Sequence, residues 1–225
     1  MCTVTYLPLE NDAFILTSNR DEQPSRATLA PKTYEEDGVL LTYPKDVVAG
    51  GTWIGTSSRK RLVCLLNGGY EAHQRAAVYA KSRGLVVKEL LKVVDVASYI
   101  DEVNFEGMEP FTIVLVDWRT SLNTFELVWD GVERYFNKLE QVPKIWSSSV
   151  LYSKEERELR MLWFDAWLAT QQSFSQEEIL RFHSNSTKGT PTSALKMKRS
   201  VVETVSVTSV VKIENRAKMT YQSFV

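Results

Sequence analysis

Cysteine and histidine are both scarce in this sequence. The 225 residues include two cysteines, Cys2 and Cys64, and two histidines, His73 and His183. So few cysteines exclude the disulfide framework of small secreted domains, and Cys64, inside an apolar run, is expected to be a small buried hydrophobe. Because neither histidine stands at a zinc-ligand spacing from a cysteine, we expect no metal site and no cofactor.

The sequence also lacks a dominant charge and a long hydrophobic run. Lysine and arginine number 27 and aspartate and glutamate 28, which gives a formal net charge of −1. A chain so balanced has no overall field that would attract nucleic acid or an anionic membrane. No stretch approaches the roughly 18 apolar residues of a membrane-spanning helix, and no secretory signal pattern is present. We therefore expect a soluble cytoplasmic protein without nucleic-acid partners and without membrane insertion.

What the sequence does contain is enough apolar material for one sizeable core. Hydrophobic residues make up 44% of the chain, which suits a single domain over residues 1–225. The apolar patterns predict strands over residues 3–7, 14–17, 61–66, 111–117, 124–129, 133–137, 201–213 and 218–225, and helices over residues 78–92, 96–103 and 154–172. This order of elements favours an α+β fold in which helices cover the outer faces of antiparallel sheets.

Capping patterns mark where two of the helices begin. Ser153 with Glu156, and Ser175 with Glu178, have the capping-box spacing. In the first of these helices an apolar face is expected at residues 159, 162, 163 and 166. The stretch 31–48, which contains two prolines and an acidic patch, reads instead as a long surface loop.

The N-terminal dipeptide Met1-Cys2 carries the most chemical information. Removal of Met1 leaves Cys2 with a thiol and a free α-amine on one residue. The amine titrates near ~8 and the thiol near ~8.5, so at neutral pH the amine can accept the thiol proton directly or through water. This is the logic of an N-terminal nucleophile that carries its own base. The alternative is that Cys2 is a small apolar residue at the start of an edge strand.

Two polar segments follow predicted strands. The segment 19–22, Asn-Arg-Asp-Glu, comes after the second strand, and a hairpin with the first strand would bring it near Cys2. Its alternative interpretation is a solvated turn. Asn67 ends a later strand and precedes Gly68-Gly69; it is either an amide donor beside a close backbone approach or part of an Asn-Gly turn.

Four segments of this sequence together resemble the NRDE family, which is that of the Transport and Golgi Organization protein. They stand in the family's order and at its approximate spacing, and they are residues 1–2, 17–22, 50–55 and 65–67. The likeness spans nearly the whole chain. This family in turn resembles N-terminal nucleophile hydrolases of the penicillin acylase and bile-salt hydrolase type. The resemblance implies a four-layer αββα sandwich with antiparallel sheets.

The same resemblance implies roles for catalytic residues. Cys2 matches the nucleophile, Asp21 matches the aspartate that holds the thiol and amine, and Asn67 matches an oxyanion donor. The hydrolases carry an arginine three residues before the aspartate, where this chain has Ser18; here Arg20 stands directly before Asp21 instead. Arg20 would either orient a substrate carboxylate or pair with Asp21 or Glu22.

Four further residues are implied as substrate-binding. Asn19 belongs to the polar cluster, and Trp53 would help to shape an apolar pocket. Where the hydrolases have a second asparagine, this chain has Ser147-Ser148-Ser149, so that role falls to a serine such as Ser148 or to a backbone amide, or it is absent. Arg199 matches a late arginine.

Two functions are compatible with the resemblance. One is an amidohydrolase that cleaves a linear, non-peptide amide of a small molecule through an acyl-Cys2 intermediate. The other is a non-catalytic transport, trafficking or haem-handling protein on the same fold. For haem, the candidate axial ligands are Cys2, His73 and His183.

Overall fold

The chain forms two compact units in the computed structural model, which describes residues 3–76 and 78–225. Unit 1 comprises Met1–Arg26 and Val142–Val225, and unit 2 comprises Ala27–Gln141. The chain therefore leaves unit 1 after two strands, completes unit 2, and returns. That the whole chain acts as a single domain stays a prediction.

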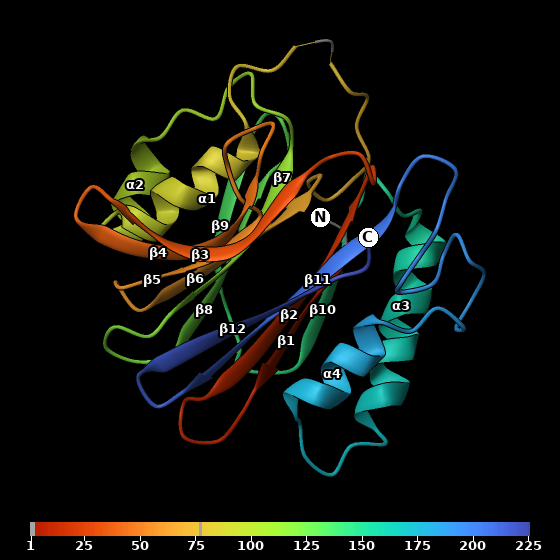
Figure 1. The fold of residues 1–225 in the computed structure, drawn as a ribbon. Helices are drawn as coiled ribbons and strands as arrows, with labels where there is room; N and C mark the ends of the chain where they lie inside the picture. Colours follow the sequence, from red (N-terminus) through yellow and green to blue (C-terminus); the bar gives the residue numbers. More distant parts are fainter. Residues whose placement is uncertain (1–2, 77) are drawn as a thin grey trace. The chain divides into compact units, whose positions relative to one another are not determined.

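Unit 1 contains a five-stranded antiparallel sheet in the order β10-β1-β2-β11-β12 (Figure 1). Its strands are β1 (Thr3–Pro8), β2 (Phe14–Glu22), β10 (Lys144–Ser147), β11 (Glu203–Ile213) and β12 (Arg216–Ser223). Helices α3 (Lys154–Leu168) and α4 (Gln176–His183) lie on one face of this sheet. The two helices and the sheet share a cluster of buried apolar side chains from Leu7, Ile15, Phe164, Ile179, Phe182 and Leu195.

The predicted helix starts in unit 1 are confirmed. The Ser153 side chain accepts a hydrogen bond from the backbone N–H of Glu156, whose carboxylate accepts one from the N–H of Ser153. Ser175 likewise accepts from the N–H of Glu178. Each such cap contributes about 1 kcal/mol to helix stability, because it satisfies a backbone donor that has no partner inside the helix.

The expected apolar face of α3 is largely wrong, although Trp163, one of its four residues, packs against the buried cluster. Leu159 and Leu162 are exposed, whereas the buried positions of the helix are Arg160 and Phe164. These two residues stand four apart and so lie on one face of the helix, which is the face turned toward the sheet. A buried arginine on this face gives the unit a polar interior that the hydrophobic pattern does not reveal.

Unit 2 contains a seven-stranded antiparallel sheet in the order β3-β4-β5-β6-β7-β8-β9. Its strands are β3 (Thr28–Glu36), β4 (Val39–Asp46), β5 (Ile54–Ser57), β6 (Arg61–Asn67), β7 (Phe111–Asp117), β8 (Asn123–Trp129) and β9 (Arg134–Leu139). Helices α1 (Arg83–Lys92) and α2 (Val96–Glu102) complete the unit, and α1 packs on β5 and β6. Cys64 on β6 is fully buried, as predicted.

The prediction of a long loop over residues 31–48 is wrong, because β3 and β4 form a hairpin there. Asp37 and Gly38 make its turn with φ angles of 52° and 73°, a left-handed conformation that glycine adopts without strain. Pro31 is tolerated because β3 is an edge strand and its register shifts between Leu29 and Lys32, where no ladder hydrogen bond is required of it. Proline is thus compatible with this strand.

Three other boundaries differ from the sequence expectations. The helix expected over 78–92 begins only at Arg83, and the short strand β10 was not expected. Strand β2 continues to Glu22, so residues 19–22 lie within the strand rather than in a turn. The last change decides the geometry of the candidate site.

The Gly50-Gly51 pair has a packing role in unit 2. A Cβ atom on Gly51 would lie 2.7 Å from the carbonyl carbon of Gly84 in α1, and the backbone N–H of Thr52 donates to the Gly84 carbonyl at 3.3 Å. Because both Gly51 and Gly84 lack a side chain, the backbone of α1 can contact the backbone of the segment before β5.

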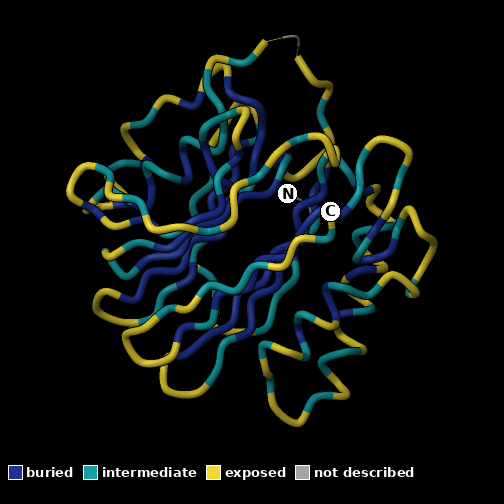
Figure 2. Tube along the Cα trace, viewed as in Figure 1, coloured by how far each residue is buried: buried dark blue, intermediate teal, exposed yellow. Residues whose placement is uncertain are grey.

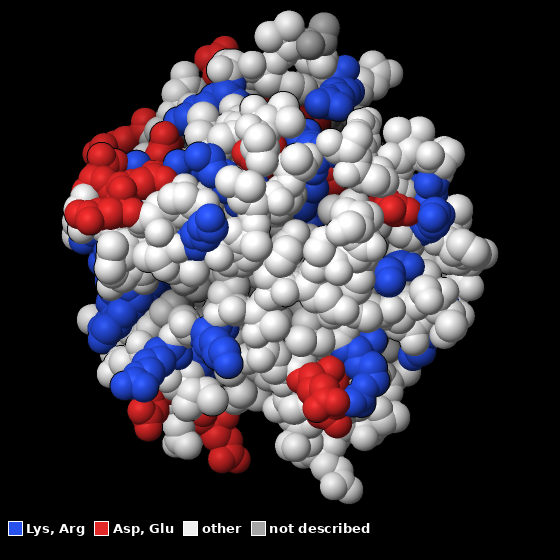
Figure 3. Space-filling model, in the orientation of Figure 1, with Lys and Arg blue, Asp and Glu red and all other residues white. Residues whose placement is uncertain are grey.

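Apolar side chains are buried in the sheets, and charged side chains lie mostly at the surface. Figure 2 shows the central strands of both sheets as buried and the hairpin tips as exposed. Figure 3 shows acidic and basic side chains interspersed, including an acidic group near the β3–β4 tip, where Lys92 pairs with Asp37 and Lys88 with Glu36. In the described part of the chain, no helix has both the length and the hydropathy to cross a bilayer.

Candidate functional site

The predicted site residues are divided between the two units. Asn19, Arg20 and Asp21 on β2, together with Ser148 and Arg199, belong to unit 1, whereas Trp53 and Asn67 belong to unit 2. The predicted nucleophile, Cys2, lies outside the described residues. The meeting of the two groups around Cys2 stays a prediction.

Successive residues of β2 point to opposite faces of the sheet. The side chains of Asn19 and Asp21 reach groups on the helix-covered side, namely His183 and Tyr152. Because side chains alternate along a strand, Arg20 lies on the opposite face. The three consecutive residues therefore do not converge on one point, as a turn would have allowed.

Asp21 is a buried carboxylate held at both oxygens. It is 3% exposed, the Tyr152 hydroxyl donates to its Oδ2 atom at 2.5 Å, and the Thr204 hydroxyl donates to its Oδ1 atom at 2.6 Å. Hydrogen bonds from two hydroxyls on separate chain segments fix the direction of the carboxylate and offset part of the cost of its burial.

A β-bulge aims Thr204 at Asp21. In the β2–β11 ladder, Thr204 stands opposite Asp21 and Ser206 stands opposite Arg20, so Val205 is an extra residue. Without it, residues 204 and 206 would share one face; with it, Thr204 faces Asp21 while Ser206 lies on the face of Arg20. The backbone N–H of Met197 donates to the Thr204 oxygen at 2.9 Å, which leaves the hydroxyl proton for Asp21.

Asn19 is part of a buried polar network that joins β1 and β2 to α4. Its Nδ2 atom donates to the carbonyls of His183 and Leu195 at 3.0 and 2.8 Å. Its Oδ1 atom therefore accepts from Nδ1 of His183 at 3.0 Å, and Nε2 of the same ring accepts from the Thr5 hydroxyl at 2.8 Å. Burial, aided by the nearby charge of Arg160, lowers the pKa of His183 to about 3. The ring is neutral, and neither nitrogen is available to a metal or haem.

Arg160 is a further buried polar side chain that the hydrophobic pattern of the sequence does not predict. It is fully buried, one guanidinium nitrogen donates to the Thr3 hydroxyl, and the other donates to the carbonyls of Ser193 and Ala194 at 3.0 and 2.6 Å. The guanidinium carbon lies 3.6 Å from the centroid of the Tyr152 ring. Arg160 therefore joins α3 to the beginning of β1 and to the phenol that holds Asp21.

Arg20, on the other face of β2, is also buried. Its guanidinium lies 3.8 Å from the carboxylate of Glu22, which in turn lies 3.5 Å from Arg26. Two buried hydroxyls share this face, those of Ser18 and Ser206. The face thus presents a cation and small hydroxyls close to the N-terminal end of β1.

Ser148 lies one residue beyond the pair formed by Thr3 and Ser147 in the β1–β10 ladder. It is buried, its hydroxyl oxygen accepts from the N–H of Leu151 at 3.4 Å, and its carbonyl accepts from the N–H of Tyr152 at 3.1 Å. Ser148 therefore begins the turn that carries Tyr152.

Arg199 has a mainly structural environment. It donates to the carbonyl of Leu151 at 2.8 Å and to that of Thr192 at 3.0 Å, and it lies 3.2 Å from the carboxylate of Glu156. These contacts tie the segment before β11 to the start of α3.

In unit 2, Asn67 and Trp53 flank the ends of β6 and β5. Asn67 pairs with Phe111 in the β6–β7 ladder, and Gly68 follows with a φ of 89° and donates its N–H to the carbonyl of Pro110 at 3.0 Å. Trp53 is buried, and its carbonyl accepts from Leu65 at 2.8 Å.

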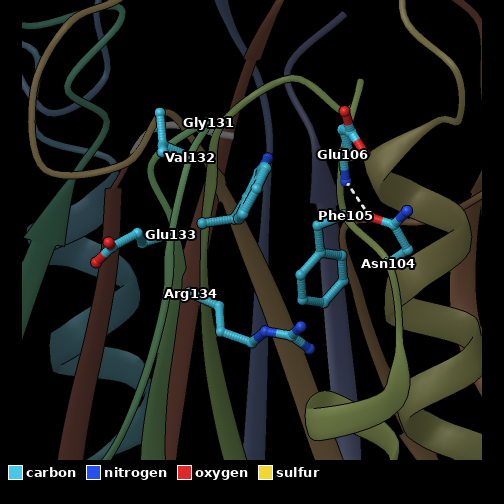
Figure 4. Close-up of a pocket in the computed structure, with 8 residues that line it drawn as sticks. Asn104, Phe105, Glu106, Gly131, Val132, Glu133 and Arg134 are labelled. Carbon is cyan, nitrogen blue, oxygen red and sulfur yellow. Dashed lines mark hydrogen bonds between the residues drawn. The ribbon is translucent and has the colours of Figure 1, made fainter.

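A cavity of about 590 Å³ in unit 2 contains none of these residues (Figure 4). It is lined by Asn104, Phe105, Glu106, Trp129, Gly131, Val132, Glu133 and Arg134. Arg134 donates to the carbonyls of Ile100 and Val103, the latter at 2.9 Å, and so caps the last turn of α2. Its charge is thus used by the fold rather than offered to a ligand.

Comparison with known proteins agrees with this arrangement. The family model described as Transport and Golgi organisation 2 matches residues 1–223. The chain belongs to that family. A curated relative, the Transport and Golgi organization 2 homolog of Mus musculus, is 31% identical over 121 residues, which are 51% of this chain and 43% of the mouse protein. The matched part is therefore less than half of the mouse relative.

Solved structures with a similar fold include an acid amidase, an acylase and a hydrolase. A Caenorhabditis elegans ortholog of N-acylethanolamine-hydrolyzing acid amidase has a TM-score of 0.63 at 11% identity and covers 92% of each chain. Penicillin V acylase from Agrobacterium tumefaciens has a TM-score of 0.52 at 10% identity, over 100% of this chain and 86% of its own. A variant of conjugated bile acid hydrolase from Clostridium perfringens has a TM-score of 0.50 at 8% identity, over 99% and 92%.

At such low identities the likeness shows the fold alone. It confirms the predicted class, an α+β fold with two antiparallel sheets and helices, which this chain shares with these three structures.

In this member of the Transport and Golgi organisation 2 family, sequence reasoning missed several residues around Asp21. They are Tyr152, Arg160, His183 and Thr204, and all four lie more than 130 positions from Asp21 in the chain. Of these, only His183 was singled out from the sequence, and then as a candidate haem ligand.

Proposed function

We propose that this protein is an N-terminal cysteine amidohydrolase, which cleaves a linear, non-peptide amide through an acyl-Cys2 intermediate. The observation that carries the proposal is the buried Asp21 carboxylate, fixed at both oxygens by Tyr152 and Thr204. In the β1–β2 ladder Thr3 pairs with Asn19, so Asp21 stands two residues beyond the start of β1. In the proposed site this carboxylate accepts a hydrogen bond from the α-amine of a Met-free Cys2.

The likeness in fold to an acid amidase, an acylase and a hydrolase supports the reaction class. Their names state that they are an N-acylethanolamine-hydrolyzing acid amidase, a penicillin V acylase and a conjugated bile acid hydrolase. A small-molecule amide is accordingly the substrate class we propose. The cytoplasmic location expected from the sequence is part of the same proposal.

The proposed reaction uses one residue as nucleophile and base. The Cys2 thiol passes its proton to the Cys2 amine, and the thiolate attacks the amide carbonyl carbon. The side-chain amide of Asn67 and a donor near Ser148 stabilise the oxyanion. The C–N bond then breaks as the Cys2 ammonium protonates the leaving amine, and water hydrolyses the thioester to give a carboxylic acid and free Cys2.

The remaining candidates have secondary roles in this proposal. Arg20, on the face opposite Asp21, orients a polar group of the substrate, and Trp53 provides an apolar wall for the acyl chain. Asn19 and Arg199, which were expected to bind substrate, are bonded within unit 1, to His183 and Glu156 respectively. We assign both to the scaffold.

Intact-mass spectrometry of the Met-free protein with a panel of N-acyl compounds tests the proposal. We expect an added acyl mass that is lost in Cys2→Ala and kept in Cys64→Ala, the matched control for a buried thiol. If Met1 is shown to be absent and no acyl class gives an adduct or a free amine, the protein is not a hydrolase. The transport or trafficking alternative would then be favoured.

A further inference from the structure

Four side chains in contact run through unit 1, from Thr3, the first described residue of β1, to Asp21. Arg160 donates to the Thr3 hydroxyl, its guanidinium carbon lies 3.6 Å from the Tyr152 ring centroid, and the Tyr152 hydroxyl donates to Asp21 at 2.5 Å. Tyr152 and Arg160 are both at most 1% exposed. Packing at this depth leaves each group a single arrangement.

The polarity of Tyr152 matches its two neighbours. Its ring face, where the aromatic quadrupole is negative, is turned to the Arg160 cation, and its hydroxyl proton is turned to the Asp21 anion. The oxygen acceptors of Arg160 are neutral, namely one hydroxyl and two backbone carbonyls. The charge of this arginine is therefore compensated mainly by dipoles, the phenol among them, rather than by a carboxylate at contact distance.

Both residues are placed by neighbouring elements rather than by the site itself. Arg160 stands on the buried face of α3, whose start is fixed by the Ser153 capping box. Tyr152 stands in the turn between β10 and α3, where its N–H bonds to the carbonyl of Ser148. A shift of α3 or of the β10–α3 turn would therefore move these two side chains and change the direction of the Asp21 carboxylate.

We propose that Tyr152 and Arg160 are positioning residues of the N-terminal site. Arg160 fixes the entry of β1 through Thr3 and supports Tyr152, and the Tyr152 hydroxyl keeps the Asp21 carboxylate directed at the Cys2 amine. The inference rests on the proposed function. The proposal implies that the reactivity of the Cys2 thiol depends on the phenol of Tyr152, which contacts neither the substrate nor the thiol.

Alkylation of Cys2 by iodoacetamide, followed by peptide mapping across pH 5–9, measures this dependence without a known substrate. In Tyr152→Phe the ring stays over Arg160, but the hydrogen bond to Asp21 is lost. We expect alkylation at pH 7 to slow by about 10- to 100-fold, the usual effect of removing an outer partner of a reactive site. The pH midpoint of the reaction should also rise, because a misdirected Asp21 holds the ammonium, and hence the thiolate, less well.

Tyr43→Phe is the matched control. Tyr43 is a buried tyrosine of unit 2 whose hydroxyl donates to the Glu36 carboxylate at 2.6 Å. Its loss should leave Cys2 alkylation unchanged. If Tyr152→Phe does not fold, as judged by circular dichroism, Arg160→Lys replaces it; that variant keeps the charge but lacks the fork that reaches Thr3 and two carbonyls, and it should slow alkylation in the same way.

The outcomes separate this inference from the proposed function. A wild-type Cys2 that reacts faster than Cys64, with a Tyr152→Phe profile that superimposes on the wild type, overturns the inference and leaves the proposed function intact. A wild-type Cys2 that is no more reactive than Cys64 overturns the proposed function, and the inference with it. A slower profile in Tyr152→Phe but not in Tyr43→Phe supports both.

Discussion

Thr204 and Asp21 face each other across the β2–β11 ladder, although 183 positions separate them in the chain, and the threonine hydroxyl donates to the carboxylate at 2.6 Å. The contact depends on the bulge at Val205, which turns Thr204 to the face of Asp21. A site built on such a contact needs both ends of the chain.

Replacing Thr204 tests this contact directly. Thr204→Val keeps the shape but leaves the N–H of Met197 and one oxygen of Asp21 without the hydroxyl. We expect a loss of about 1–3 kcal/mol in unfolding free energy, measured by urea denaturation, together with slower alkylation of Cys2. Thr204→Ser keeps the hydroxyl and should retain the alkylation rate. Equal alkylation rates in the two variants would show that the hydroxyl does not act on the site.

The buried His183 ring predicts a pH dependence of stability. Its pKa is about 3 in the folded protein, because burial and Arg160 disfavour the charged ring, whereas the unfolded chain has an ordinary histidine near 6.5. Below pH 6.5 the unfolded state binds the proton that the folded state excludes. The folded protein therefore loses up to about 1.4 kcal/mol per pH unit from pH 6.5 down toward pH 3.

Urea denaturation at pH 7.5, 6.5, 5.5 and 4.5 measures this slope. His183→Gln removes the titrating ring, so its stability should fall less steeply with pH than that of the wild type. A wild-type slope that persists in His183→Gln would contradict the assignment.

Asn67→Ala tests the oxyanion role in the proposed reaction. Loss of one oxyanion donor typically lowers kcat by ~10²- to 10³-fold, and Asn67, at the end of β6, should contribute little to stability. Once a substrate is found, steady-state kinetics and thermal melting measure the two effects. Asn123→Ala removes an amide at the start of another strand of unit 2 and serves as the control. Unchanged turnover with a large melting shift would make Asn67 a turn residue.

Gly51→Ala tests whether the Gly50-Gly51 pair serves packing. The added methyl group would lie 2.7 Å from the Gly84 backbone, which cannot move as a side chain can. We expect a loss of about 1–3 kcal/mol, the usual cost of overpacking, in thermal or urea unfolding. Gly38→Asn is the control, since Gly38 has open space around it and a φ that asparagine tolerates. Equal stability of Gly51→Ala and the wild type would show that packing against Gly84 does not require a glycine at position 51.

The sequence indicates the elements of this fold better than it indicates the site. Strands such as 111–117 follow from local apolar pattern, and the two capped helix starts follow from Ser153 and Ser175 with their glutamates. The β3–β4 hairpin was missed because prolines at 31 and 44 normally interrupt strands; an edge position and a register shift accommodate Pro31.

The polar network around Asp21 could not be predicted from local pattern. Asn19 and Asp21 were singled out by resemblance, but their partners His183, Tyr152 and Thr204 come from three other parts of the chain. Arg20 was expected to meet them at one end of the fold; because residues 19–22 are part of β2, its side chain lies on the opposite face. The partners of Asn19 and Asp21, and the face on which Arg20 lies, depend on strand pairing between distant segments. The periodicity of the sequence does not specify this pairing.

The division of the chain has a consequence for biosynthesis. Unit 2 is one continuous segment, Ala27–Gln141, whereas β1 and β2 of unit 1 find their neighbours β10 and β11 only beyond Lys144. On the ribosome unit 2 can complete its pairings first, while the β1–β2 hairpin still lacks its outer neighbours β10 and β11. Asp21 can therefore acquire its Thr204 contact only after β11 has been translated. A nascent or C-terminally truncated chain would lack the assembled site.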